Sequence, residues 1–302
     1  MKVLVTGAAG FIGSHVVQAL LERQFSVIAV DNLATGRRSN VSPKAQFYEI
    51  DITSDDLEYI FKIEQPDYVI HLAAQSSVLV SMEKPVEDCK VNLLGTLNIL
   101  RFSNKYGIKR CAFASTAAVY GNPSTLPVAE SAKLSPISFY ALSKLSAERY
   151  AQLYDNLFGF KSCILRFSNV YGPLQAGGVV TSILNSLIEG KNPIIFDGNQ
   201  TRDFIYVKDV AEACIHSLLS DKTGVFNISS STEISIQKVY EEISKLTGIK
   251  LEPIYKALRE GEIEKSVLSN TKAILSLGWS PTYSLVDGLN ETIQHYINLK
   301  QT

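Results

Sequence analysis

The 302-residue sequence has no surplus of charge of either sign, because 29 lysine and arginine residues stand against 30 aspartate and glutamate residues. Domains that bind nucleic acid usually carry a basic surplus, so this balance argues against a nucleic-acid partner. Long hydrophobic runs are also lacking: no apolar segment approaches the roughly 20 residues that span a bilayer, and the N-terminus does not have the layout of a signal peptide. We therefore expect a cytoplasmic protein with no membrane partner.

Cysteine and histidine are scarce, at four residues each. Cys89, Cys111, Cys163 and Cys214 lack the spacing of metal ligands, and the last three lie in apolar surroundings, which suits reduced thiols in a cytoplasm. The histidines are widely separated and give no zinc site, so we expect no metal. His71 ends an apolar run and is expected to pack or to bind the backbone; a role as a base is less consistent with this position.

Three glycines, Gly7, Gly10 and Gly13, follow an apolar run at the N-terminus. This run and the helical pattern of residues 11–23 predict a strand, a tight turn and a helix. Glycines in such a turn let the backbone approach a pyrophosphate, which the amides and the dipole of the helix N-terminus attract. The spacing is Gly-x-x-Gly-x-x-Gly, and it predicts a dinucleotide-binding turn.

A second apolar run, residues 26–31, ends in Asp31. At this position a carboxylate can accept hydrogen bonds from the adenosine ribose hydroxyls, and it repels a 2′-phosphate. The expected cofactor is therefore NAD, with NADP disfavoured. Arg37 and Arg38 follow several residues later and fit ordinary loop charges. The alternative for Asp31 is a turn residue at the end of a strand.

Tyr140 and Lys144 lie four residues apart in a segment with a helical pattern. Residues at this spacing share a helix face, so the ammonium group can lie beside the phenol and stabilise its phenolate. A free tyrosine titrates near ~10 and is a poor base, so the cation would make Tyr140 a proton shuttle near neutral pH. A surface pair with no catalytic role is the alternative, because the spacing also occurs by chance.

Short apolar runs alternate with helical patterns through the first half of the chain. The predicted strands after the first two cover residues 47–51, 68–71, 111–115 and 162–166, and the predicted helices cover residues 55–63, 86–106 and 139–156. This alternation predicts an α/β fold with a doubly wound parallel sheet, which binds ligands at the carboxyl ends of its strands. We expect a Rossmann domain over residues 1–168 and a smaller mixed α/β domain over residues 169–302, with the chain crossing between them.

Further motifs lie at residues 51–52, 71–74, 92–96, 115–121, 166–173 and 201–207. Together with the glycine turn and the Tyr140–Lys144 pair, they resemble the extended short-chain dehydrogenase/reductase family, whose members rearrange nucleotide-activated sugars. The resemblance covers almost the whole chain. It implies that Thr116, Tyr140 and Lys144 are catalytic, and that the residues in contact with NAD are Gly7, Gly10, Phe11, Ile12, Gly13, Asp31, Asn32, Asp51, Ile52, Leu72, Ala73, Ala74, Asn92, Tyr140 and Lys144.

The resemblance also implies a substrate site. Asn169 and Arg202 would bind the substrate diphosphate, and Arg259 would add a second cation. Without the family motif, Arg202 beside Asp203 fits a salt-bridged surface arginine equally well. The full set of implied substrate-binding residues is Thr116, Tyr140, Asn169, Arg202, Arg259, Glu262 and Ser266.

Residues 117 and 118 bear on the choice among the reactions of this family. The family's 4,6-dehydratases carry Asp-Glu there, since eliminating water needs an additional acid and base, and its UDP-glucuronate decarboxylases carry a glutamate at the second position. Here both residues are alanine, Ala117 and Ala118. The chain therefore resembles the family's UDP-hexose 4-epimerases, which serve galactose metabolism. A 4-ketosugar reductase using NADPH and a non-catalytic NAD-binding protein remain alternatives.

The resemblance carries two further expectations. A bulky tyrosine at the position of Ser266 goes with restriction to glucose and galactose, so the small Ser266 implies acceptance of N-acetylated sugars as well; in the alternative, other walls set the pocket size. Uronic acids are less expected, because Leu174 stands where family members often have an arginine. Pairing of the helices at residues 86–106 and 139–156 with those of a second copy implies a homodimer.

Overall fold

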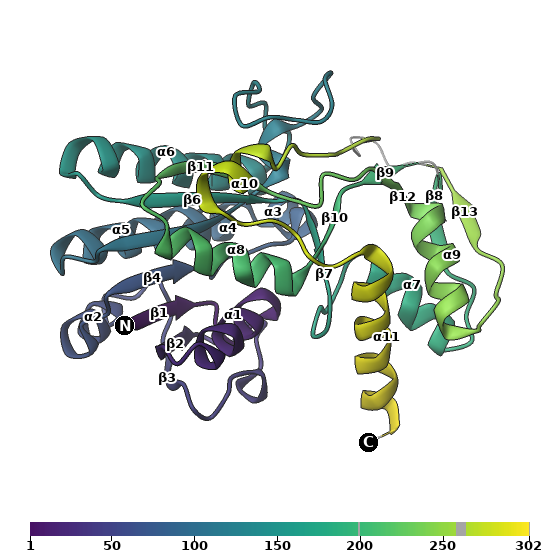
Figure 1. Ribbon diagram of the computed structural model, residues 1–302, viewed down its shortest axis with the longest axis horizontal. Helices are drawn as coiled ribbons and strands as arrows, with labels where there is room; N and C mark the ends of the chain where they lie inside the picture. Colours follow the sequence, from purple (N-terminus) through teal and green to yellow (C-terminus); the bar gives the residue numbers. More distant parts are fainter. Residues whose placement is uncertain (199, 258–263, 302) are drawn as a thin grey trace.

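The computed structural model describes residues 1–198, 200–257 and 264–301. Within them the largest sheet has seven strands, all paired in parallel, in the order β11-β6-β5-β4-β1-β2-β3 (Figure 1). The order reverses beside β1, which is the doubly wound arrangement that the sequence predicts. The strands are β1 (Lys2–Thr6), β2 (Ser26–Asp31), β3 (Gln46–Glu49), β4 (Tyr68–His71), β5 (Arg110–Thr116), β6 (Ser162–Phe167) and β11 (Gly224–Ile228).

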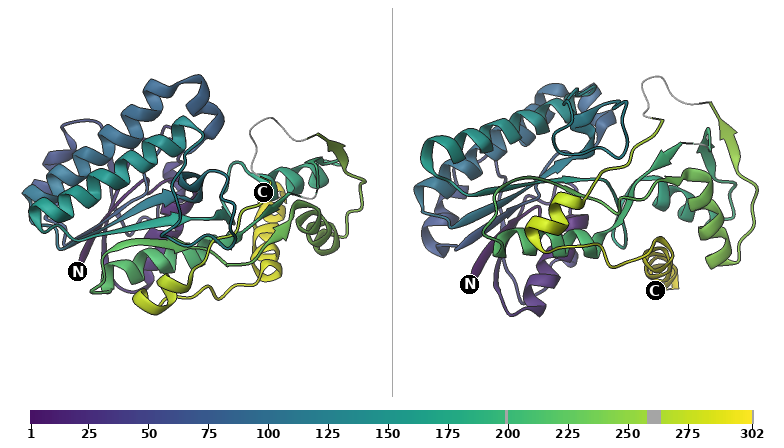
Figure 2. Two further views of the ribbon diagram at one scale, coloured as in Figure 1. Left: turned by 90° about the horizontal axis from the view of Figure 1, so that it is seen from above. Right: turned by 45° about the horizontal axis from the view of Figure 1, so that its top comes forward.

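Helices cover both faces of this sheet (Figure 2). Alternate residues of a strand point to opposite faces, so Val3 and Val5 belong to one core cluster and Leu4 to the other. Because both faces are buried, the strands are continuous apolar runs, as is usual for parallel sheets. The first cluster includes α1 (Phe11–Glu22), α8 (Val207–Leu219) and α10 (Thr271–Leu277), and the second includes α2 (Leu57–Glu64), α5 (Gly95–Lys105) and α6 (Phe139–Phe158).

The segment 86–106, predicted as one helix, contains a π-helical turn. After α3 (Val78–Glu83), α4 (Pro85–Cys89) is followed by the π-helical segment η2 (Lys90–Leu94), and only then by α5. A π-turn adds one residue to a helical turn and is frequent at functional sites. Here it contains Asn92, whose side chain is buried and hydrogen-bonds to the backbone of Gln75. Helical backbone runs without a break from residue 85 to residue 105, so the helix predicted over residues 86–106 is confirmed. Hydrophobic periodicity does not register one added residue, so the π-turn inside it was not predicted.

A second group of elements lies beyond the carboxyl ends of the main strands, on the right in Figure 1. Its helices share a core that includes Leu184, Ile195, Tyr240 and Leu289. The helices are α7 (Val179–Ile188), α9 (Ile236–Thr247) and α11 (Leu285–Gln301), and the paired strands are β7 (Asn169–Tyr171) with β10 (Phe204–Tyr206), β9 (Thr201–Arg202) with β12 (Ile234–Ser235), and β8 (Ile194–Phe196) with β13 (Ile254–Lys256).

The chain passes between the two groups more than once, since β11, α8 and α10 belong to the main sheet and its covering helices although they follow residue 169. The division at residue 168 stays a prediction. Among the described residues, no helix combines the length and the hydropathy needed to cross a membrane. Two short 3₁₀ turns complete the structure, η1 (Arg38–Asn40) and η3 (Ala117–Tyr120).

Candidate active site

The glycine turn between β1 and α1 is closely packed. Gly7 has φ +68°, and a Cβ atom there would lie 2.7 Å from the backbone nitrogen of Ala73. A Cβ atom on Gly13 would lie 1.9 Å from the carbonyl oxygen of Gly7. Only glycine fits at these two positions, so the loops after β1 and β4 can approach each other closely. The helix begins at the N-cap Gly10, which has no side chain to occupy the first amides, and this open cradle fits a dinucleotide pyrophosphate.

Asp31 at the end of β2 holds the glycine turn directly. Its buried carboxylate accepts hydrogen bonds from the backbone nitrogens of Ala9 at 2.9 Å and Leu33 at 2.8 Å. Next to it, the Asn32 side chain donates to Asp51 at 2.8 Å. Asp31 therefore does stabilise the turn at the end of its strand, which was the alternative role for this residue. Contact with a ribose would use the remaining lone pairs of the carboxylate.

The Asn92 side chain belongs to a buried network that sequence analysis missed. The carboxylate of Asp88, 1% exposed, accepts hydrogen bonds from Gln75 at 2.8 Å, Asn92 at 3.0 Å and Ser143 at 2.6 Å. Ser143 lies on α6 between Tyr140 and Lys144, so Asp88 links the loop after β4 to that helix. In the sequence, only the spacing of four residues between Asp88 and Asn92 could have indicated that these two side chains lie together on one helix face.

Tyr140 lies in the first turn of α6, which Ser138 caps by accepting a hydrogen bond from the Ala141 nitrogen at 3.1 Å. Burial raises the pKa of Tyr140, while a hydrogen bond from Thr116 at the end of β5 lowers it and the charge of Asp88 raises it. Burial of the phenol outweighs the hydrogen bond from Thr116, so the pKa of Tyr140 is raised in this structure. The expectation that Lys144 brings it towards neutrality stays a prediction.

Lys144 is 5% exposed, and burial lowers its pKa to about 8, while the charges of Glu148 and Asp88 raise it. His71 lies nearby, and burial together with the charge of Lys144 lowers the pKa of His71 to about 3. This histidine hydrogen-bonds to the hydroxyls of Thr6 at 2.7 Å and Thr96 at 3.0 Å. The neutral, packed ring agrees with the interpretation that His71 is not a base.

Two of the residues expected to bind substrate, Asn169 and Arg202, lie on the short strands β7 and β9 beyond the sheet. Asn169 begins β7 and is exposed, and its nitrogen donates to the carbonyl of Asp203 at 2.9 Å. The guanidinium of Arg202 donates to the carbonyl of Thr201 at 2.8 Å, and the Ser266 nitrogen donates to the same carbonyl at 3.3 Å. Arg202 and Ser266 are therefore brought side by side. Arg259 and Glu262 lie outside the described residues.

In residues 1–198, 200–257 and 264–301, no cluster of histidine, cysteine, aspartate or glutamate side chains could hold a metal ion. The four cysteines are free, and Cys111, Cys163 and Cys214 are buried, as their apolar surroundings predict.

The structure has a doubly wound parallel sheet, a glycine turn at the switch point of that sheet, and a Tyr-x-x-x-Lys helix. Together these features define an enzyme of the extended short-chain dehydrogenase/reductase type. The family model described as "NAD dependent epimerase/dehydratase family" matches residues 3–229. The chain belongs to this family, and its cofactor is NAD. The resemblance inferred from the sequence motifs is thereby confirmed.

Three similar proteins cover nearly the whole chain. A putative UDP-glucose 4-epimerase of Methanocaldococcus jannaschii is 43% identical, over 99% of this chain and 100% of its own. The crystal structure of a UDP-glucose 4-epimerase of Thermotoga maritima with UDP-glucose has a TM-score of 0.97 and 40% identity, over 99% and 100% of the two chains. A UDP-N-acetylglucosamine 4-epimerase of Methanobrevibacter ruminantium, in complex with UDP-N-acetylmuramic acid, has a TM-score of 0.95 and 33% identity, over 99% and 98%.

Proposed function

We propose that this enzyme reversibly inverts C4 of UDP-hexoses, interconverting UDP-glucose and UDP-galactose and also their N-acetylated counterparts. The observation that carries the proposal is the hydrogen bond of Thr116 to Tyr140, with Lys144 buried one helical turn further along α6, in a chain that matches UDP-hexose 4-epimerases over nearly its full length. Ala117 and Ala118 supply no acid or base for a dehydration, which agrees with this reaction.

Tyr140 would take the proton of the 4-hydroxyl group and return it after the sugar has turned over. The Thr116 hydroxyl would hydrogen-bond to the same sugar hydroxyl and to Tyr140. Bound NAD supplies a hydride acceptor and the positive charge of its nicotinamide ring. Because burial raises the pKa of Tyr140, its phenolate is a strong base that needs adjacent positive charge, and Lys144, one helical turn away on α6, would provide it.

The nucleotide part of the substrate would lie along the strands beyond the sheet. Asn169 and Arg202 would bind the diphosphate together with Arg259, and Glu262 would line the same site. Ser266, held beside Arg202 by the shared carbonyl of Thr201, would border the C2 substituent of the sugar. The likeness to a UDP-N-acetylglucosamine 4-epimerase supports a pocket that admits an acetylated sugar.

Two measurements test this function. Unfolding the purified protein should release about one NAD per chain, and UDP-galactose should be converted to UDP-glucose with no cofactor added. A 4-ketosugar reductase would instead consume stoichiometric reductant, and a non-catalytic NAD-binding protein would release NAD without converting either sugar. Either result would refute the proposed epimerisation.

Asp31 should make NAD bind more tightly than NADP, because its carboxylate is fixed at the end of β2, where a 2′-phosphate would meet like charge. Asp31→Ala is expected to narrow the ratio of the two affinities. Titrations of cofactor-free native and variant protein with both cofactors measure that ratio. Equal affinity of the native protein for NAD and NADP would contradict this prediction.

We further propose that the enzyme is a cytoplasmic homodimer. On the outer face of α6, five apolar side chains are 42–65% exposed and recur at helical spacing: Phe139, Leu142, Tyr150, Leu153 and Leu157. Leu79 of α3 and Val86 of α4 add exposed apolar surface, and these two helices pack against α6. A continuous apolar face of this kind favours a partner surface of the same chemistry, which a second copy supplies. The free cysteines, of which three are buried, support the cytoplasmic location.

Leu153→Glu is expected to convert the dimer into monomers, because it places an unpaired charge in the middle of that face. Sedimentation velocity measures the change, and Leu275→Glu on α10, where the native side chain is 80% exposed, is the matched control that should remain dimeric. A monomeric native protein, or a dimeric Leu153→Glu variant, would show that α6 does not form the interface.

A further inference from the structure

Lys144 belongs to a buried group of four charged side chains. Lys144 is 5% exposed, Glu148 is 4%, Arg166 is 2% and Asp88 is 1%. They come from α6, from β6 and from α4, so the fold brings two cations and two anions together behind the active site. Charges buried to this extent persist only when they are balanced and hydrogen-bonded.

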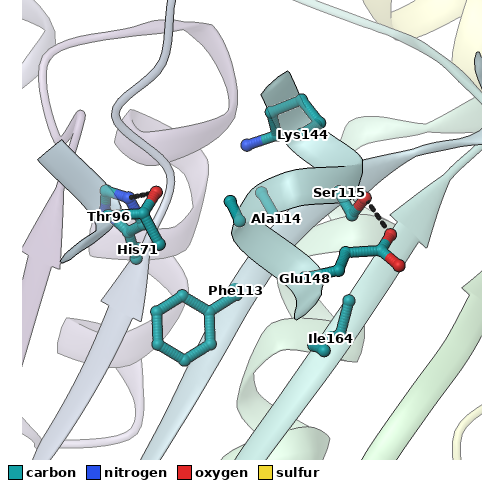
Figure 3. A pocket seen from close by; sticks show the side chains of 9 residues that line it. His71, Thr96, Phe113, Ala114, Ser115, Lys144, Glu148 and Ile164 are labelled. Atoms are coloured by element: carbon teal, nitrogen blue, oxygen red, sulfur yellow. Dashed lines mark hydrogen bonds between the residues drawn. The ribbon is translucent and has the colours of Figure 1, made fainter. Parts of the chain in front are cut away.

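Glu148 follows Lys144 by one helical turn, and the two side chains line the same small cavity (Figure 3). The remaining polar lining comes from His71, Thr96 and Ser115. The cavity volume is about 10 Å³, which is close to the least that one water molecule needs. The side chains of Lys144 and Glu148 therefore border one small space, in which little solvent can screen the attraction between their charges.

The position of Glu148 is fixed by strong contacts. Its carboxylate accepts hydrogen bonds from Arg166 at 2.6 Å and 3.0 Å, and from the hydroxyl of Ser115. Arg166 also donates to the hydroxyl of Tyr120 at 2.9 Å, which ties the pair to η3. Glu148 is thus held in place by three hydrogen bonds, and Arg166 does not line the cavity.

We propose that Glu148, anchored by Arg166 and Ser115, is a positioning residue that keeps Lys144 protonated during turnover. The inference rests on the proposed epimerase function, in which Lys144 supports the phenolate of Tyr140. Burial alone removes hydration from the ammonium group and favours its neutral form, so a fixed negative charge must offset that loss. Glu148 is the stronger of the two carboxylates that raise the pKa of Lys144, and Asp88 is the other.

The other groups that face Lys144 cannot replace Glu148. His71 on β4 is neutral, because its pKa is about 3, and Tyr140 on α6 contributes negative charge only when it ionises. Asp88 on α4 also acts on Tyr140, whose pKa it raises, so its charge opposes the phenolate as well as supporting the ammonium group. Among the described groups that shift these two pKa values, Glu148 acts on Lys144 without acting on Tyr140.

Glu148→Gln tests the inference through the pH dependence of kcat for UDP-galactose. Without the negative charge Lys144 should lose its proton more easily, so the alkaline limb of the profile should move to lower pH by about one unit. Glu148→Asp retains the charge and should restore the limb towards its native position. Arg149→Gln, an exposed neighbour on the same helix, is the control whose profile should match the native one.

If Glu148→Gln does not fold, the double variant Glu148→Gln/Arg166→Gln carries the test, because it removes the pair without leaving a buried charge unpaired. The alkaline limb of the pH profile of this double variant should still move to lower pH, because Glu148 lines the cavity and Arg166 does not. The shift should be smaller than in Glu148→Gln, because the positive charge of Arg166 is removed as well. If kcat falls equally at every pH and the alkaline limb does not move, Glu148 has only a structural role, and the inference is wrong. An inactive native protein would instead refute the proposed function.

Discussion

Replacing Tyr140 with phenylalanine should reduce turnover of UDP-galactose by roughly 10²- to 10⁴-fold, which is the usual contribution of general acid-base catalysis. The variant removes one hydroxyl from a half-buried side chain in the first turn of α6 and leaves the ring in place. NAD should stay bound, because Lys144, the glycine turn and Asp31 are unchanged. Initial rates and NAD released on unfolding, measured on the same preparation, separate the loss of proton transfer from the loss of cofactor.

Tyr59→Phe on α2 is the matched control, since Tyr59 is 62% exposed and removing its hydroxyl should leave the rate at the native level. Turnover within a few-fold of native for Tyr140→Phe would show that another group moves the proton. If the Tyr140→Phe variant has lost its NAD, Tyr140 is instead needed to hold the cofactor.

Ser266→Tyr should depress kcat/KM for the N-acetylated sugars by roughly 100-fold while the smaller sugars lose little, because a group that no longer fits is excluded strongly. Ser266 is partly buried, and its backbone is fixed to the carbonyl of Thr201, so the new ring could not simply move away with the chain. Rates for all four UDP-sugars give the selectivity directly.

Ser266→Ala conserves the small size and should preserve the native ratio between acetylated and plain sugars. Native protein that ignores the acetylated sugars would show that other walls limit the pocket. Equal losses for both pairs of sugars in Ser266→Tyr would show that the tyrosine disturbs the site without acting on the C2 substituent.

The glycine turn and the sheet could be predicted from sequence because their causes are local. Gly7 needs a positive φ, and apolar runs such as Val3 to Val5 are buried on both faces. The π-helical segment around Asn92 could not be predicted, since one added residue leaves the hydrophobic pattern almost unchanged.

The burial that raises the pKa of Tyr140 could not be predicted either. The spacing to Lys144 gives the neighbouring charge, but the dominant cause is the burial of the phenol, which depends on how β5, α4 and α6 pack. The hydrogen bond from Arg202 to the carbonyl of Glu264, close to Ser266, joins residues 62 positions apart in the chain and depends on the tertiary fold. The position of Glu148 could have been predicted from the sequence, because Glu148 follows Lys144 by four residues and so lies on the same face of the helix.

In the proposed reaction, C4 of the sugar is oxidised and reduced on bound NAD without exchange of the C4 hydrogen with solvent. Conversion of UDP-galactose in D₂O, with no cofactor or reductant added, tests it most directly when the C4 position of the product is followed by NMR. The account predicts UDP-glucose at equilibrium with protium retained at C4. Deuterium at C4, or no conversion unless a reductant is consumed, would contradict it.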